Sequence, residues 1–494
     1  MNPPLPDSLL STPVSGGIIL TTLNARYRHA ALGLRCLKAN LAELAPYATI
    51  MEFDIHHRPL DIAEALLQHR PAIIGIGVYV WNLEPVTHLL AILNSIVPET
   101  IVVLGGPEAG YAPEDASWHA AADIIITGEG EWVFRDLCRE FYAKGGLPRL
   151  QSRRIIAPPV DLSRVVLPYS FYDAEDVKHR FTYVEASRGC PHGCSFCLSA
   201  HDAPVRTVDM AAFLAAMGDL LHRGARQFKF VDRTFNLNTA HATAILDFFL
   251  ERMCPGLFVH FEMIPDRLPQ PLKDRLVAFP QGSIQLEIGL QTFDPPTRER
   301  IHRRQDDDAA ERNLSWLRTH TRVHLHADLI LGLPGESVTR MGAGFDRLLQ
   351  LGPHEIQVGI LKRLHGTPLA RSDRVRGMVF NPVAPYDLLA SDQIDFPTMQ
   401  RLRRFARYWD LIGNSGRFPG FVAWLGTQAS PFASFMTLSD WLFATIRQTH
   451  EIAQARLFKL VHQGLVEALM LDPLQVRQMI DPEGGATSKK KMGA

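Results

Sequence analysis

Three cysteines lie within eight residues of this 494-residue chain, at Cys190, Cys194 and Cys197. Thiolates are soft ligands that suit iron–sulfur clusters and zinc. Three thiolates on one short loop can hold three irons of a cubane cluster and leave the fourth iron without a protein ligand. An open coordination position is what separates catalytic from structural zinc sites, and the same logic applies to iron. The C-x3-C-x2-C spacing therefore predicts a cluster at which chemistry takes place.

Two other interpretations of this loop compete with the cluster. A structural zinc site could be completed by His192 or His201, although zinc fingers usually pair two separated C-x2-C halves. Cys194 and Cys197 could instead form a thioredoxin-like redox pair, although such a pair needs no third cysteine upstream.

A second set of polar residues alternates with apolar residues in the predicted strands that follow the loop. Residues two apart in a strand share a face. His260 and Glu262 therefore share one face, and His324, His326 and Asp328 share another. Buried polar groups without partners cost about 1–3 kcal/mol each, so a ligand or water must satisfy them. We expect these polar faces to line a binding cavity, with Glu262, His324 and His326 as candidates for substrate contact or proton transfer.

The elements that carry these residues form two βα series. The first, up to about residue 142, alternates short apolar runs with amphipathic helices and predicts a Rossmann-like open parallel sheet. In such sheets ligands bind beyond the carboxyl ends of the strands. The candidate ligand contacts at these ends are Asn24, Tyr79, Asn82, Gly105, Gly106, Gly128 and Glu129.

The second series contains six predicted strands separated by amphipathic segments, which indicates a partial (β/α)6 TIM-like barrel. A helical pattern replaces the strands after the barrel. The expected fold class is α/β with a helical C-terminal domain. The expected division is a Rossmann-like domain at 1–150, a linker at 151–178, the barrel at 179–370, a helical domain at 371–482 and a disordered tail at 483–494.

Composition limits the classes of partner and compartment. Fifty-one Lys and Arg balance fifty-two Asp and Glu, so no global positive field favours a nucleic acid or an anionic membrane. The longest apolar run falls well short of the ~18–20 residues of a membrane span. Six cysteines are too few for a disulfide framework, and the first fifteen residues lack the pattern of a secretory signal. We therefore expect a protein of the reducing cytoplasm.

The cysteine loop resembles that of the radical S-adenosylmethionine (radical SAM) superfamily, in which an aromatic residue precedes the last cysteine, as Phe196 does here. The segment 328–336 resembles the motif on the fifth strand of many members. The resemblance implies that the open iron of a 4Fe-4S cluster chelates S-adenosylmethionine. An electron from a flavodoxin- or ferredoxin-like donor then cleaves a sulfur–carbon bond and yields methionine and a 5'-deoxyadenosyl radical.

The resemblance also implies contacts to S-adenosylmethionine, residue by residue. Members usually carry Gly-Gly-Glu at the end of the second strand, and this chain has Asp232, Arg233 and Thr234 nearby instead, without the glycines. Glu287 and Gln291 match the strand-four position that often contacts the ribose or carboxylate. The expected cofactor contacts are Phe196, Asp232, Arg233, Thr234, Glu287, Gln291 and Gly332.

The first domain resembles the cobalamin-binding domain of one branch of this superfamily, through the glycine-containing segments 104–107 and 126–131. The cobalt-ligating motif Asp-x-His-x-x-Gly is absent after the first strand, because Asp54 and His56 follow a different strand and continue differently. Any cobalamin is therefore expected to be bound base-off without a protein histidine. The alternative is a domain that kept this fold and lost the corrin.

This resemblance implies radical chemistry on a small molecule, with cobalamin delivering a methyl group to an unactivated carbon. The first alternative is a radical cyclisation, rearrangement or tRNA modification without cobalamin. The second is a zinc-stabilised, non-catalytic binding protein.

Three further segments, at 24–29, 232–238 and 405–410, resemble an uncharacterised bacterial subgroup with a helical C-terminal domain of unknown function. Within that domain, four arginines predict either an anion-binding patch or a solvated helix face. They are Arg401, Arg403, Arg404 and Arg407.

Overall fold

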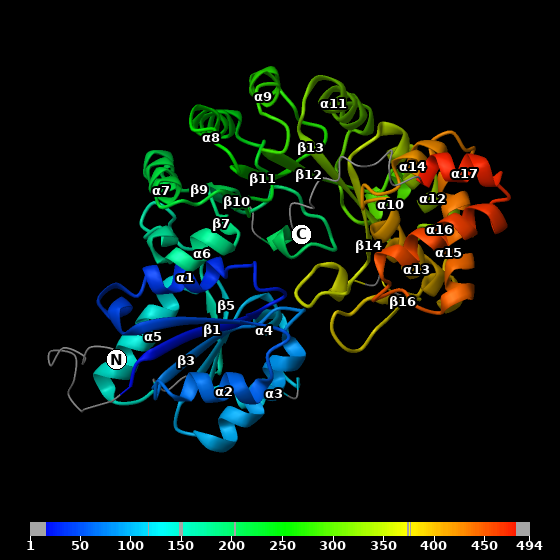
Figure 1. The fold of residues 1–494 in the computed structure, drawn as a ribbon. Coiled ribbons are helices and arrows are strands. Elements are labelled where there is room, and N and C mark those ends of the chain that lie inside the picture. The colour runs from blue at the N-terminus through cyan, green and yellow to red at the C-terminus, as the bar shows by residue number, and fades with distance from the viewer. Residues whose placement is uncertain are drawn as a thin grey trace.

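The computed structural model describes residues 16–116, 118–147, 152–201, 204–372, 375 and 377–480, so the predicted disordered tail lies outside the described residues. Figure 1 shows two parallel β-sheets with their helices, followed by a helical C-terminal domain. None of the helices in these ranges has the length and hydropathy needed to cross a bilayer.

The first sheet has six parallel strands in the order β2-β1-β3-β4-β5-β6, which confirms the predicted Rossmann-like sheet. Its order reverses between β1 and β3, and such a switch point opens a crevice at the carboxyl ends of the strands. The strands are β1 (Ile18–Asn24), β2 (Ala48–Asp54), β3 (Ile73–Gly77), β4 (Ile101–Gly105), β5 (Ile124–Gly128) and β6 (Arg154–Ala157). The helices are α1 (Leu32–Ala39), α2 (Pro59–Leu67), α3 (Leu83–Ile96), α4 (Pro107–Tyr111) and α5 (Glu131–Lys144), with short 3-10 turns η2 (Ala42–Tyr47) and η3 (His119–Ala121).

The segment predicted as a linker, 151–178, is partly ordered into elements. Its residues Arg154–Ala157 form β6 and pair with β5 from Ile125 to Gly128, so the first domain extends beyond residue 150. A 3-10 turn η4 (Pro168–Phe171) and the helix α6 (Ala174–His179) follow, and the Asp173 side chain caps α6. The sequence missed β6 because four residues among prolines and arginines show no periodicity. These residues form a strand only because they pair with the edge of β5.

The second sheet is also parallel, in the order β14-β13-β12-β11-β10-β7, and it curves into the arc of a partial barrel (Figure 1). Its strands are β7 (Thr182–Val184), β10 (Gln227–Phe230), β11 (Phe258–Met263), β12 (Ile284–Gln291), β13 (His324–Leu331) and β14 (Glu355–Ile360). Its helices are α7 (Met210–His222), α8 (Thr239–Glu251), α9 (Gln270–Leu276), α10 (Pro295–Arg300), α11 (Asp307–His320) and α12 (Val338–Leu351). A small ladder of β8 (Ser187–Arg188) and β9 (Arg206–Thr207) and a turn η5 (Leu198–His201) surround the cysteine loop.

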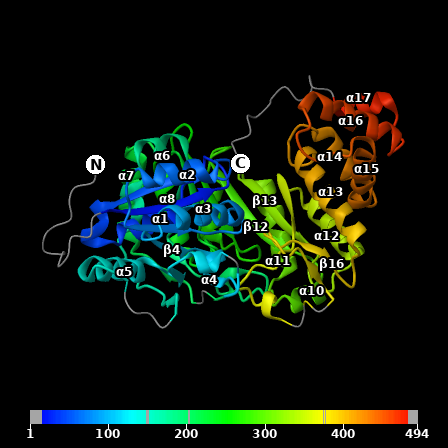
Figure 2. The same ribbon diagram turned by 90° about the horizontal axis from the view of Figure 1, so that it is seen from below.

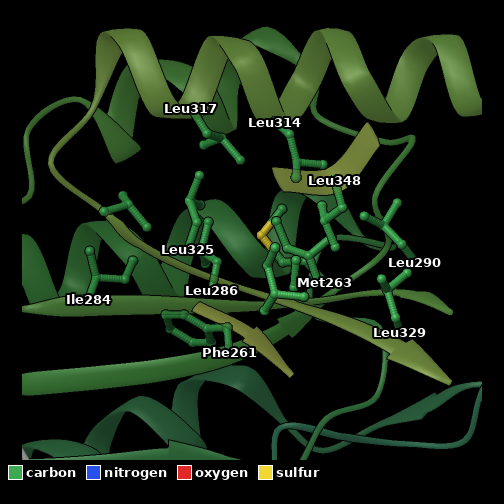
Figure 3. Packing of buried hydrophobic residues seen from close by; sticks show 14 of the residues in the cluster. Phe261, Met263, Ile284, Leu286, Leu290, Leu314, Leu317, Leu325, Leu329 and Leu348 are labelled. Carbon is green, nitrogen blue, oxygen red and sulfur yellow. The ribbon is translucent and has the colours of Figure 1, made fainter. Parts of the chain in front are cut away.

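The apolar face of the barrel sheet packs against its helices. Burial alternates residue by residue along β12 and β13, as the sequence predicted. Figure 3 shows Leu314 and Leu317 of α11 pointing at the sheet, where Leu286 and Leu325 meet them. Because every second residue of these strands is committed to this core, the polar residues between them lie on the opposite face.

The helical domain begins after the strands β15 (Val379–Phe380) and β16 (Leu388–Ala390), which pair with each other, and a short 3-10 turn η6 (Leu369–Arg371). It packs on the edge strand β14. The Trp409 indole donates to the carbonyl O of Ile356 at 3.0 Å, and the Asn414 side chain bonds both the N–H and the C=O of Ile356. The backbone N–H and C=O of Ile356 on this edge are thereby satisfied. The helices are α13 (Phe396–Ile412), α14 (Pro419–Leu425), α15 (Pro431–Ile446), α16 (Gln454–Glu467) and α17 (Pro473–Ile480).

The four arginines of α13 do not gather into an anion patch. Three form separate ion pairs, and the Arg404 guanidinium lies over the Phe443 ring at 4.2 Å. The ion pairs are Arg401–Asp440, Arg403–Asp387 and Arg407–Asp410.

The first domain lies against the open side of the barrel arc, as Figures 1 and 2 both show. At the β7 side, the backbone N–H of Phe181 donates to the carbonyl of Arg28. Beyond β14, the buried Glu108 of α4 accepts from the Tyr386 hydroxyl at 2.6 Å and lies 3.1 Å from Nδ1 of His365. The first domain therefore spans the gap between the two edge strands of the barrel.

Candidate active site at the domain interface

The cysteine loop leaves the carboxyl end of β7 and is held in place by backbone hydrogen bonds. Gly189, directly before Cys190, has φ of +107°, a backbone conformation that residues with a side chain rarely adopt. Ser195 donates its N–H to Ile301 and accepts from the N–H of Leu369, so distant segments fix the loop on both sides. Burial raises the pKa of Cys190, and the neighbouring Cys197 and Cys194 thiols add to the increase.

Arg303 is a functional candidate that the sequence did not reveal. Its Nη1 lies 3.7 Å from Sγ of Cys194, its Nη2 donates to the carbonyl of Gly289, and its Nε donates to Gln305 at 3.1 Å. Burial raises the pKa of Cys194, and Arg303 opposes that increase. The sequence offers no signal that separates Arg303 from the adjacent Arg304, because the contact joins positions 109 residues apart.

The donors of this loop are three thiols and the ring of His192, whose buried Nε2 has no hydrogen-bond partner among the described residues. The His201 ring, one possible fourth zinc ligand, has Nε2 2.5 Å from the carbonyl O of Gly366. In the part of the chain that is described, no three His, Cys, Asp or Glu side chains are gathered as a site for one metal ion. A single ion draws all its ligands around itself, whereas a cubane spreads three thiolates over three irons. The loop therefore fits a cluster better than zinc.

Asp232 holds the strand that leads into the loop. Its carboxylate accepts the N–H of Ala186 at 3.0 Å and the hydroxyl of Ser187 at 2.6 Å. Burial raises its pKa to about 7, although these hydrogen bonds oppose the increase. The predicted contact to S-adenosylmethionine is thus turned toward β7, where it positions the approach to Cys190.

Arg233 lies next to Asp232 but points the other way. Its Nη1 lies 3.0 Å from the Glu262 carboxylate, and it lines the cavity between the two domains. Burial raises the pKa of Glu262, and the charge of Arg233 opposes that increase. Thr234 is buried, and its hydroxyl has no hydrogen-bond partner among the described residues. Phe196 packs at the margin of the barrel core.

The strand register assembles the polar face of the barrel into rows. Glu262, Glu287, His326 and Glu355 are neighbours across β11 to β14. His326 lies 3.3 Å from Asp328 and 3.5 Å from Glu355. Burial acts to lower the pKa of His326, but the bond and charge of Asp328 outweigh it, and the net shift is upward. His326 is therefore suited to hold a proton at this face.

Two further pairs of side chains lie on this face, His260 with Glu287 and His324 with Glu355. His260 Nε2 lies 2.9 Å from Glu287 Oε2. Burial acts to raise the pKa of Glu287, yet the hydrogen bond from His260 helps bring the net shift downward. His324, the third catalytic candidate, lies 3.2 Å from Glu355. His324 and His326 thus share Glu355, whereas Glu287 pairs with His260 and Glu262 with Arg233.

Gln291 and Gly332 have unusual backbones. Gln291 has φ of +71° at a bulge in the β12–β13 ladder, and its side-chain amide folds back over Gly289. Bulges of this kind commonly re-aim side chains near active sites. Gly332 has φ of +83°, and a Cβ there would collide with Leu388 of β16, so packing against the C-terminal segment explains this glycine.

A cavity of about 490 Å³ separates the glycine-rich ends of β3, β4 and β5 from the cysteine loop. A Cβ on Gly105 would meet nothing within 4 Å, so this position faces open space. Gly106 and Gly128 have φ of +92° and +93°, and a Cβ on either would strike a carbonyl oxygen. The lining residues include Tyr79, Gly105, Gly106, Gly128, Glu129, Arg188, Gly189, Leu198 and Arg233.

The two predicted asparagine contacts are tied to the backbone and are not among the lining residues. The fully buried Asn82 amide donates to the carbonyls of Leu23 and Gly77 and accepts the N–H of Tyr79, which joins the ends of β1 and β3. Asn24 donates to the carbonyl of His29 and to Glu52.

Ionic contacts connect the cavity wall to the cysteine loop. Arg188, two residues before Cys190, lies 2.7 Å from both Glu131 and Glu185 and 3.4 Å from Glu129. Glu129 also pairs with Arg206 and accepts the N–H of Val160. Glu129 thus lines the cavity, but its carboxylate is already paired with Arg206 of the barrel domain. None of the described lining residues is a histidine, and His57 pairs with Asp54 at the exposed end of β2.

Comparison with known proteins divides the chain in the same way. Residues 18–138 match the B12 binding domain, residues 184–343 match the radical SAM superfamily, and residues 376–481 match a domain described as a protein of unknown function (DUF4080). The chain contains a B12-binding domain and a radical SAM domain. The radical SAM match contains all three cysteines of the loop, and the B12 match contains the glycine-rich ends of β3 to β5.

Similar proteins include methyltransferases. The chain is 25% identical over 62% of its length to the 2-(S-pantetheinyl)-carbapenam-3-carboxylate methyltransferase of Streptantibioticus cattleyicolor. It is 23% identical over 64% of its length to the cobalamin-dependent radical SAM methyltransferase TokK of Streptomyces tokunonensis. The chain spans 49% and 50% of the length of these two relatives.

Among solved structures, TsrM of Kitasatospora setae with cobalamin and a [4Fe-4S] cluster bound superposes with a TM-score of 0.59 at 18% identity. The match covers 76% of this chain and 82% of TsrM. This match shows that the two proteins share a fold.

Proposed function

We propose that this radical SAM protein reductively cleaves S-adenosylmethionine at a 4Fe-4S cluster and transfers a methyl group, with cobalamin, to an unactivated carbon of a small molecule. One observation carries the proposal. The cavity between the domains is lined on one side by Gly189 and Leu198, which flank the three-cysteine segment, and on the other by the glycine ends of a B12-type sheet. The relatives include methyltransferases, and one of them is named a cobalamin-dependent radical SAM methyltransferase.

Cys190, Cys194 and Cys197 would hold the cluster, and the cluster would supply the electron that splits the sulfonium. Asp232 fixes the backbone before Cys190, and Arg303 contacts Cys194, so both act on the geometry of the loop. Hydrogen bonds to cluster sulfurs are among the protein's means of setting a reduction potential.

Contacts to S-adenosylmethionine would come from the carboxyl-end residues Arg233, Glu262, Glu287 and Gln291. Arg233 and Glu262 form a pair at the cavity, and a guanidinium is well suited to a carboxylate. The proposed contacts to S-adenosylmethionine also include Phe196, Thr234 and Gly332.

The B12-type sheet would hold cobalamin at the glycine-rich carboxyl ends of its strands, where the absence of a side chain at Gly105 leaves room. Tyr79, Gly106, Gly128 and Glu129 would border the corrin. Base-off binding without a protein histidine is supported by the histidine-free lining among the described residues.

His326 is the best-placed proton carrier of the polar face. Asp328 and Glu355 both lie within 3.5 Å of its ring and favour the protonated form. We assign proton transfer to His326 and substrate contact to Glu262 and His324. A flavodoxin- or ferredoxin-like donor would supply the electrons. The described cysteines are all free, which suits the reducing cytoplasm.

The test is anaerobic reconstitution of the full chain with iron and sulfide, followed by reduction in the presence of S-adenosylmethionine. We expect a broad absorption near ~400 nm and formation of 5'-deoxyadenosine, both lost in the triple Cys→Ala variant of the loop. Zinc in place of iron would refute the proposal, and so would a cluster that leaves S-adenosylmethionine intact.

Cobalamin binding separates methyl transfer from the alternative radical reactions. Protein produced with added cobalamin should retain the corrin through gel filtration. A protein that forms 5'-deoxyadenosine but retains no corrin would instead carry out a cyclisation, a rearrangement or a nucleic-acid modification.

A further inference from the structure

A second constellation lies at the opposite end of the barrel from the cysteine loop. Strand register places Tyr183, Lys229, His260, Gln285 and His324 in one row across β7, β10, β11, β12 and β13. This row lies two residues, about 7 Å, toward the amino-terminal ends from the row that contains Glu262 and Glu287. Of this row, only His324 has a function assigned above.

The first domain brings more cationic groups to this row through the loop after β1. The guanidinium of Arg28 lies 4.9 Å from the centre of the Phe181 ring, and the ammonium of Lys229 lies 4.3 Å from the centre of the same ring. Nδ1 of His29 lies 2.6 Å from the Tyr183 hydroxyl. The backbone hydrogen bond from Phe181 to Arg28 holds the loop in this place. The segment 24–29, which the sequence singled out, therefore meets β7 here.

The positive charges at this end lack a matching anion. Within the described residues, the Lys229 ammonium makes no ion pair or hydrogen bond and rests on the Phe181 ring. Burial lowers its pKa, the charge of Glu287 only partly compensates, and Arg28 lowers the pKa further. Glu287 itself is bonded to His260.

A buried donor also points to a missing partner. His260 is 6% exposed, and its Nδ1 has no hydrogen-bond partner among the described residues. An unpaired buried polar group and a poorly compensated buried ammonium are both costly unless something binds them. Arg28 is exposed, and His29 and Lys229 are partly exposed, so the row can be reached from solvent.

From these contacts we infer that the amino-terminal end of the barrel face binds an oxyanion, a carboxylate or a phosphate, through Lys229, Arg28 and the His260 ring, with Tyr183 and His29 beside it. We assign the oxyanion to the substrate. Only this assignment rests on the proposed function, because the binding of an oxyanion is argued from the contacts alone. An anionic end held here extends the rest of the molecule along the polar face toward Glu262 and the cysteine loop. The substrate class is thus a small molecule with a carboxylate or phosphate at one end.

The test uses the full-length protein and needs neither cluster nor S-adenosylmethionine, so its failure differs from failure of the proposed function. Inorganic phosphate and acetate are titrated calorimetrically at one ionic strength set with potassium chloride. We expect saturable binding of at least one of them. Phosphate binding alone indicates a phosphate-bearing substrate, and acetate binding alone indicates a carboxylate. Binding of neither ion would overturn the inference.

Four substitutions, one of them a control, locate the site. Lys229→Met should weaken binding at least tenfold, and Lys229→Arg should retain most of it. Lys38→Met is the matched control, because Lys38 is also a partly buried lysine over a phenylalanine ring, at 5.1 Å from Phe171, but belongs to α1 outside this row. If Lys229→Met fails to fold, the exposed Arg28→Gln variant serves instead and should weaken binding several-fold. Unchanged affinity for the ion in folded Lys229→Met, or in Arg28→Gln where it replaces that variant, would overturn the inference.

Discussion

Replacing Asp232 by asparagine should stabilise the protein at pH 8, although the residue sits at the approach to the cysteine loop. Its carboxyl is 2% exposed, and burial raises its pKa to about 7 from the ordinary 3.8. The folded state therefore holds this proton more tightly than the unfolded chain does. The stability that the neutral form contributes is complete below pH 4 and is lost progressively as the pH rises to about 7.

The magnitude follows from the shift. About three pKa units at 1.36 kcal/mol each give a cost of at most about 4 kcal/mol above pH 7. Asparagine carries no charge and can keep both contacts, since its oxygen accepts the N–H of Ala186 and its amide can donate to the Ser187 hydroxyl. For a domain of this size, 1 kcal/mol corresponds to about 2–4 °C in melting temperature.

The assay is thermal unfolding of Asp232→Asn and the wild type, under anaerobic conditions, at pH 5.5 and pH 8. The advantage of the variant should be several degrees at pH 8 and clearly smaller at pH 5.5. Asp219→Asn, an exposed aspartate of α7, controls for the change in net charge. The reasoning fails if Asp232→Asn is less stable than the wild type at pH 8, or if its advantage is the same at both pH values.

Further predictions concern the loop, the interface, the sheet edge and the cavity. Arg303→Gln removes a cationic donor from Cys194 and should lower the cluster reduction potential, measured by redox titration with electron paramagnetic resonance. Glu52→Gln leaves the buried Arg35 guanidinium undercompensated and should destabilise the chain by about 3–5 kcal/mol in urea unfolding. Asn414→Ala exposes backbone groups of β14 and should cost about 1–3 kcal/mol and promote aggregation, detected by light scattering. Gly105→Leu should fold normally but fail to retain cobalamin on gel filtration, because its side chain would enter open space in the cavity.

The sequence by itself determined the features that depend on local pattern. The spacing of Cys190, Cys194 and Cys197 identifies a loop with three soft ligands whatever surrounds it. Alternation along β12 and β13 assigns Glu287 and His326 to the face away from the helices, because burial in a strand has a period of two. Both parallel sheets followed from the order of apolar runs and amphipathic helices.

Tertiary structure decided which partner each polar group meets. Asn82 and Asp232 follow strands as ligand-binding residues do, yet their side chains bond the protein's own backbone. Arg303 reaches Cys194 across more than a hundred residues, and Lys229 meets Arg28 only because two domains dock at Phe181. Local sequence records whether a side chain is buried and on which face of its element. The direction of a hydrogen bond and the closeness of two charges depend on how distant segments pack, which no local periodicity contains.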